Sequence, residues 1–138
     1  MKIVLDTNVL VAGLLSPFGS CGDIVRMVSS GTLTPCFDAR ILSEYGEVLK
    51  RPKFRFAVDE VDALLDFIAF NGLTVAPSPL SKPLPDPDDE PFLEVAMAGH
   101  VVCLVTGNRV HFPAGRRQGV KVLSLREFLT RYRARNLQ

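Results

Sequence analysis

The chain begins Met1-Lys-Ile-Val-Leu-Asp-Thr-Asn-Val-Leu10, a short apolar run that leads into a single carboxylate. The apolar residues are typical of a buried strand, and Asp6 falls where that strand should end. A charge at the end of a hydrophobic strand costs free energy unless a partner compensates it. In an open α/β sheet, ligands bind in the crevice at such strand ends. We therefore expect Asp6 to anchor a metal site or to cap the helix that starts near Asn8.

The composition is that of an ordinary globular domain. The chain has 138 residues, of which 47% are hydrophobic and 22% charged, so we expect one domain over residues 1–138. No stretch approaches the roughly 18 consecutive apolar residues of a membrane span, and the first residues do not resemble a signal peptide. The three cysteines are odd in number and lack CxxC spacing. They predict reduced thiols, a cytoplasmic location and no membrane partner.

Basic residues gather near the end of the chain. The net charge is only +1, which gives no global argument for a nucleic-acid partner. Acidic residues cluster instead in 59–66 and 86–94. A basic end beside acidic patches could steer a polyanion toward a cation-filled pocket, although a solvated C-terminal helix is the simpler explanation. The basic residues between 109 and 135 are Arg109, Arg116, Arg117, Lys121, Arg126, Arg131, Arg133 and Arg135.

Apolar spacing and turn residues predict short strands that alternate with helices. The expected strands are 3–5, 32–37, 73–76, 101–105 and 121–123. The expected helices cover 9–15, 20–30, 39–51, 58–70, about 89–98 and the residues after 124, with Ser20–Asp23 and Ser124–Glu127 as capping boxes. This alternation implies a mostly parallel sheet covered on both faces, whose carboxyl-terminal strand ends lie on one edge with Asp6.

Helical phase separates inward from outward carboxylates. In the helix that follows Asp38, Glu44 lies at the border of the apolar face, whereas Glu47 points away from it. In the helix near 89–98, Asp89 lies on the apolar face and Asp88 is rotated away. Each has a second interpretation: Glu44 could reach solvent, and Asp88 or Asp89 could cap the helix.

Together, Asp6, Glu44 and Asp89 predict a metal site. Carboxylates that converge cannot all stay ionised without a cation, because like charges raise one another's pKa. Oxygen clusters of this kind suit Mg²⁺ or Mn²⁺. Such a metal makes a nucleophile of water and offsets charge on a phosphate, as phosphodiester hydrolysis requires.

Four motifs resemble those of the PIN-domain family, and in particular the PIN-family toxins of bacterial toxin–antitoxin systems. The resemblance extends over almost the whole chain, with the motifs in the family's order. They are Val4-Leu-Asp-Thr-Asn-Val-Leu10, Ile41-Leu-Ser-Glu-Tyr-Gly-Glu-Val-Leu49, Asp86-Pro-Asp-Asp-Glu-Pro-Phe-Leu-Glu-Val-Ala96 and Leu104-Val-Thr-Gly-Asn108.

The resemblance implies a three-layer α/β/α fold and a Mg²⁺- or Mn²⁺-dependent endoribonuclease that cleaves single-stranded RNA with metal-activated water. It places the family's acids at Asp6, Glu44 and Asp89. It also implies a homodimer and a cognate antitoxin protein that blocks the site.

One motif departs from the family pattern. Many members have an Asp at the position of Asn108, and some have an acid where this chain has His111. Asn108 offers a neutral oxygen, so we expect one metal, or a second that binds only with substrate. His111 could contact phosphate or the antitoxin, or simply be exposed. The residues expected to position water or substrate are Thr7, Asn8, Thr106, Asn108, Arg109, His111, Arg116 and Arg117.

Asn108 also supports an alternative, a PIN-fold RNA- or protein-binding module with weak or no catalysis. Two other classes fail on the residues. A haloacid-dehalogenase phosphatase needs a second Asp where this chain has Asn8, and Gly19-Ser-Cys-Gly22 lacks the dinucleotide-binding GxGxxG pattern.

Overall fold

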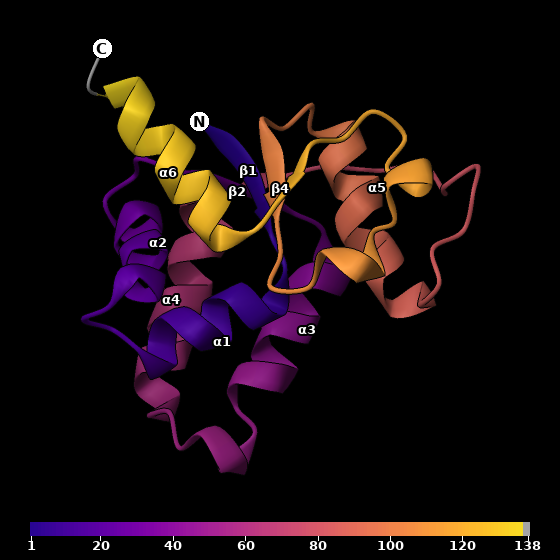
Figure 1. Ribbon diagram of the computed structural model, residues 1–138. Helices are drawn as coiled ribbons and strands as arrows, with labels where there is room; N and C mark the ends of the chain where they lie inside the picture. The colour runs from indigo at the N-terminus through magenta and orange to yellow at the C-terminus, as the bar shows by residue number, and fades with distance from the viewer. Residues whose placement is uncertain (137–138) are drawn as a thin grey trace.

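The computed structural model describes residues 1–136, which form five parallel strands flanked by helices (Figure 1). The strand order is β3-β2-β1-β4-β5, and every pairing is parallel. The predicted three-layer α/β/α architecture is confirmed. Four of the five strands are shorter than predicted, whereas β1 begins one residue earlier. The strands are β1 (Lys2–Leu5), β2 (Thr34–Phe37), β3 (Leu73–Thr74), β4 (Cys103–Val105) and β5 (Val122–Leu123).

Six α-helices connect and cover these strands in the described residues. Helix α5 packs against β1, β2 and β4, while α6 packs against β5. Within residues 1–136 no single helix is long and apolar enough to cross a membrane; α1 and α2 reach that length only together, and they meet at 109°. The helices are α1 (Thr7–Leu15), α2 (Ser20–Ser29), α3 (Ala39–Leu49), α4 (Val58–Asn71), α5 (Glu90–Ala98) and α6 (Leu125–Asn136). Four 3₁₀ turns complete the chain: η1 (Pro52–Phe54), η2 (Pro87–Asp89), η3 (Arg109–His111) and η4 (Ala114–Arg116).

The central strand β1 is buried on both faces. Ile3, Val4 and Leu5 are each 0% exposed, as expected for a parallel strand between two helical layers. Tyr45 of α3 is also fully buried, and its hydroxyl donates a hydrogen bond to the carbonyl of Leu5. This bond fixes α3 against the end of β1, directly beside Asp6.

The two predicted capping boxes have different outcomes. Ser124 and Glu127 cap α6 reciprocally, with N···O distances of 3.0 and 3.1 Å, so that prediction is confirmed. The Ser20–Asp23 box is wrong, because Gly19 is the N-cap of α2 and makes no side-chain cap bond. Asp23 instead pairs with Arg26 and with Arg133 of α6, the latter at 2.8 Å.

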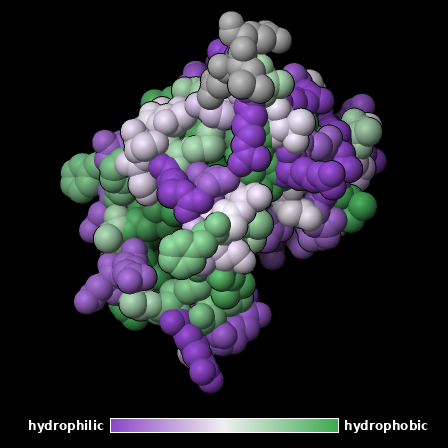
Figure 2. All heavy atoms as spheres, turned by 60° about the vertical axis from the view of Figure 1, so that its left-hand side comes forward, coloured by the Kyte–Doolittle hydropathy of each residue, from purple (hydrophilic) through white to green (hydrophobic). Residues whose placement is uncertain are grey.

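Half of the basic residues near the end of the chain lie on α6. Figure 2 views the molecule from the side of α2 and α6 and shows hydrophilic side chains over much of this face. Arg126, Arg131, Arg133 and Arg135 are all exposed. Their placement agrees with the solvated-helix interpretation of these charges.

The strand order places a crevice beside β1. From β1 the chain adds β2 and β3 on one side, and then returns to add β4 and β5 on the other. Ligands of open α/β sheets bind at the point where the strand order reverses, here between the carboxyl ends of β1 and β4. Asp6 follows β1 and Thr106 follows β4, so both lie at that point.

Candidate acidic site at the ends of β1 and β4

Asp6 is held at the reversal point by two hydrogen bonds to its carboxylate. Oδ1 accepts the backbone N–H of Thr7 at 2.8 Å, and Oδ2 accepts the hydroxyl of Thr106 at 2.7 Å. The residue is 6% exposed and is the N-cap of α1, which begins at Thr7, earlier than predicted. The capping interpretation of Asp6 therefore holds, and it coexists with a position in the site.

Glu44 faces the same crevice from α3. Its carboxylate accepts a hydrogen bond from the hydroxyl of Thr7. Glu47, three residues later, is exposed and pairs with Arg51 at 2.9 Å. The prediction that Glu44 rather than Glu47 faces inward is confirmed.

Asp89 enters the crevice from the start of α5. It is the N-cap of that helix but makes no side-chain cap bond, so the capping interpretation of Asp89 is wrong. Asp88 is exposed and caps no helix, and Asp86 instead accepts the N–H of Asp88 at 2.9 Å. Oδ2 of Asp89 is buried without an aligned hydrogen bond, although Nδ1 of His111 stands 3.2 Å from it.

These acids line one open cleft of about 290 Å³. Its walls bring together residues that are far apart in the sequence, from the start of α1 and from α3, η1, η2 and η3. Of the predicted site residues, six line it. The lining residues are Asp6, Thr7, Asn8, Val11, Glu44, Val48, Phe54, Asp89 and His111.

The pKa values of the three acids are all raised. Burial is the largest cause for each, and it raises the pKa of Asp89 to about 6. The negative charge of Asp6 raises the pKa of both Glu44 and Asp89 further. Hydrogen bonds oppose this effect, from Thr106 and Thr7 for Asp6 and from Thr7 for Glu44. The cleft thus holds carboxylates whose ionised forms need positive charge.

The loop after β4 ties the crevice together through polar contacts. The hydroxyl of Thr106 accepts the N–H of Asn108 at 3.1 Å, and Asn8 Oδ1 accepts the N–H of Gly107 at 3.0 Å. The side chain of Asn108 does not line the cleft. It caps η3 through the N–H of Val110 and lies 3.1 Å from Nε2 of His111. In this arrangement Asn108 supports His111, and His111 reaches the acids.

The three arginines expected to guide a phosphate backbone lie outside the cleft lining. Arg109 pairs with Glu127 of α6 at 2.9 Å. Arg116 donates to the carbonyl of Pro83 at 3.1 Å, and Arg117 donates to the carbonyl of Phe112 at 2.8 Å. In the structure all three join loops to neighbouring segments.

The donor set fits a hard divalent cation. Asp6, Glu44 and Asp89 supply oxygen atoms, and the unbonded buried Oδ2 of Asp89 lacks a partner that a cation could provide. In the described part of the chain, however, no three acidic, histidine or cysteine side chains stand close enough together to hold one ion. Glu44 is turned onto Thr7 and Asp89 toward His111, so metal binding requires these side chains to exchange partners.

Phe54 lines the cleft, although the sequence patterns did not predict it there. Its signal was the run Arg51-Pro-Lys-Phe-Arg-Phe56, in which basic and aromatic residues alternate just after α3. Helical periodicity does not extend into this short turn, so it does not predict which way Phe54 faces.

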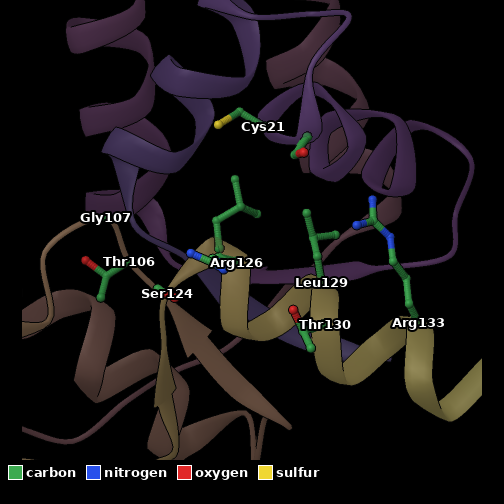
Figure 3. A pocket seen from close by; sticks show the side chains of 10 residues that line it. Cys21, Thr106, Gly107, Ser124, Arg126, Leu129, Thr130 and Arg133 are labelled. Atoms are coloured by element: carbon green, nitrogen blue, oxygen red, sulfur yellow. The ribbon is translucent and has the colours of Figure 1, made fainter.

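A larger cavity of about 560 Å³ lies on the other side of Thr106 and Gly107, between α2 and α6 (Figure 3). Cys21, Leu129 and Arg133 project into it, and its lining contains no acidic residue. It therefore has no donor set for the metal chemistry that the acidic cleft suits.

Replacing Thr106 tests how Asp6 is held. Thr106→Val removes the hydroxyl that bonds Asp6 and leaves a buried carboxylate with one fewer donor. We expect the free energy of unfolding to fall by about 1–3 kcal/mol and the pKa of Asp6 to rise further. Urea unfolding measures the first change. Thr106→Ser keeps the hydroxyl, and equal losses in the two variants would contradict this role.

Comparisons with known proteins identify the family of this chain. A family model described as the PIN domain matches residues 2–110, a range that contains every acid of the cleft. The chain is also 28% identical over 112 residues to the uncharacterized protein MJ1680 of Methanocaldococcus jannaschii, which covers 79% of this chain and 72% of that protein. No solved structure matches the chain. On the strength of the family match, this chain belongs to the PIN domain family.

Proposed function

We propose that the protein is a Mg²⁺- or Mn²⁺-dependent endoribonuclease that hydrolyses phosphodiester bonds of single-stranded RNA. PIN domains are generally nucleases. The observation that carries the proposal is the cleft itself, where Asp6, Glu44 and Asp89 converge with raised pKa values and one buried oxygen of Asp89 has no aligned hydrogen bond.

Each acid has a role that follows from its surroundings. Asp6 is the most rigid, held by Thr7 and Thr106, and would hold the cation together with Asp89. Glu44 accepts only the Thr7 hydroxyl, and its raised pKa suits a group that accepts a proton from the attacking water. A bound Mg²⁺ or Mn²⁺ would lower the pKa of that water and offset charge on the phosphate.

Cleavage of a labelled single-stranded RNA tests the proposal. We expect cleavage with Mn²⁺ or Mg²⁺, none with EDTA, and a loss of at least about 1,000-fold in Asp6→Asn, because several kcal/mol of charge stabilisation disappear. Glu47→Gln, an exposed change on the same helix, is the matched control and should keep full activity. Intact RNA with the wild-type protein and either metal would contradict the proposal.

The biological part of the proposal is a cytoplasmic toxin of a toxin–antitoxin pair, acting as a homodimer and blocked by a cognate antitoxin. Its support is the resemblance of the four motifs quoted above. Induced expression in bacteria should arrest growth, and Asp6→Asn should relieve the arrest. Equal growth with both proteins would count against a toxin role, and light scattering of the purified protein measures the oligomer.

A second candidate is a PIN-fold binding module without catalysis. It is favoured by one observation, that within residues 1–136 no three candidate side chains already stand close enough to hold a metal ion. Metal titration separates the two. A nuclease should gain melting temperature with Mn²⁺ and lose that gain in Asp6→Ala, whereas a binding module should show no such gain.

A further inference from the structure

Residues 51–56, Arg51-Pro-Lys-Phe-Arg-Phe56, follow the helix that carries Glu44. They contain the turn η1 (Pro52–Phe54) and bring one aromatic ring to the acidic cleft, because Phe54 lines it together with Asp6 and Asp89. No role in the predicted chemistry explains this ring. We call residues 51–56 the aromatic turn.

Two phenylalanine rings of the aromatic turn are stacked. The ring centroids of Phe54 and Phe56 are 5.6 Å apart, and their planes differ by 13°. Phe56 packs against the hydrophobic core, whereas Phe54 is not among the described residues that do so. Arg55 between them has φ of 57°, an uncommon left-handed conformation for a residue with a side chain. Phe56 therefore anchors the turn and Phe54 is presented at the cleft.

One cation lies over the presented ring, and a second follows it in the sequence. Lys53 Nζ lies 5.0 Å from the centroid of Phe54. Lys53 and Arg55 are exposed, and neither forms an ion pair with any residue of the described chain. Arg51 differs, because Glu47 already neutralises it at 2.9 Å. The aromatic turn thus places the partly exposed ring of Phe54 and two positive charges without an ion-pair partner beside the acidic cleft.

We propose that the aromatic turn is the binding platform for single-stranded RNA, with an unpaired base stacked on Phe54 and flanking phosphates on Lys53 and Arg55. Bases stack on aromatic side chains regardless of sequence, and basic side chains track the backbone. A duplex keeps its bases paired and cannot offer these faces. The proposal rests on the proposed nuclease function and identifies which part of the chain binds the substrate, since the predicted arginines bond elsewhere.

Equilibrium binding measures the affinity of the proposed platform for RNA independently of cleavage. Asp6→Asn serves as the parent protein, so that the RNA stays intact during the measurement. The probe is a fluorescein-labelled single-stranded RNA of about ten nucleotides, a length that falls within the usual site sizes of single-strand-binding grooves. Fluorescence anisotropy in Mg²⁺ should show that adding Phe54→Ala weakens binding by about 5- to 150-fold, the usual loss of one stacked base. Phe54→Tyr should bind like the parent, and so should Phe70→Ala, which removes a ring that is 89% exposed on α4.

Salt dependence tests the two cations. The slope of log affinity against log salt concentration should become shallower by about 0.7 for each of Lys53→Ala and Arg55→Ala, as expected for one phosphate contact to a single strand. Lys121→Ala should leave the slope unchanged. Lys121 lies at the amino-terminal end of β5, whereas the cleft lies at the carboxyl-terminal ends of β1 and β4.

Several outcomes would overturn the platform. One is equal affinity of Phe54→Ala and its parent, and another is equal affinity for single strand and duplex. If Phe54→Ala lowers the melting temperature, Phe54→Leu decides instead, since it keeps apolar bulk but has no aromatic face. Failure of the parent to bind RNA that the wild-type protein cleaves would reject the platform and leave the proposed activity intact. Failure of the wild-type protein to cleave, with binding that depends on Phe54, would reject the activity alone.

Discussion

Asp89→Asn will abolish cleavage and at the same time make the metal-free protein more stable. Burial and the nearby charge of Asp6 raise the pKa of the Asp89 carboxyl from 3.8 to about 6. Below pH 3.8 the group is protonated in both the folded and the unfolded chain, so it costs the folded state nothing. Between pH 3.8 and about 6 the unfolded chain ionises first, and folding loses stability as the pH rises.

Above about pH 6 the folded protein bears the full free-energy cost of ionising the buried Asp89 carboxyl, and asparagine removes that cost. After allowance for solvent screening in the open cleft, we expect a gain of about 1–2 kcal/mol at pH 7.5 and only a small part of that gain at pH 4. The melting temperature should rise by about 3–8 °C. Cleavage should fall by at least about 1,000-fold, because the cation loses a carboxylate.

Thermal unfolding at both pH values, in EDTA, measures the gain. Asp88→Asn is the matched control, since Asp88 is the adjacent residue and is exposed. It should change neither the melting temperature nor the cleavage rate appreciably. A lower melting temperature of Asp89→Asn at pH 7.5 would show that the carboxylate is already stabilised without metal.

Gly22→Ala will strongly destabilise the fold. Gly22 is buried in the first turn of α2, where that helix meets the turn that follows α1. An added Cβ would lie 2.3 Å from the carbonyl oxygen of Pro17 and 2.8 Å from its Cα. These are backbone atoms and cannot rotate away, so we expect a loss of at least about 3 kcal/mol in the free energy of unfolding, at the upper end of overpacking costs.

Gly46→Ala is the matched control in α3. Its added Cβ would approach only the flexible end of Leu65, at 3.4 Å. Because alanine favours helix over glycine, we expect a gain of up to about 1 kcal/mol. Urea unfolding of both variants measures the difference in sign. Similar stabilities for the two would mean that α1 and α2 can separate without cost.

Sequence periodicity correctly predicted which way the side chains of helices and strands point. Helical phase placed Glu44 and Asp89 in the cleft and left Glu47 and Asp88 outside, as the structure has them. The apolar run before Asp6 predicted a strand buried on both faces, because side chains alternate across a strand and both sets were apolar.

The loops could not be predicted in this way. Asn108 was expected in the site, yet its amide caps η3 and supports His111 instead. Arg109 was expected near substrate but pairs with Glu127, whose own capping role the sequence had indicated. Such contacts join residues that no short period relates, so only the assembled chain determines which partner each side chain finds.

The bond between Asp6 and Thr106 also sets when the cleft can form. These two residues are 100 positions apart, and Asp6 cannot gain the Thr106 hydroxyl until β4 has paired with β1. At synthesis rates of about 5–20 residues per second, on the order of 5–20 s separate the two residues on the ribosome. During that interval the nascent chain already contains the residues of the aromatic turn and Glu44, but not Thr106. Under the proposed function, a growing chain therefore carries the proposed RNA-binding residues before it carries the complete acidic site.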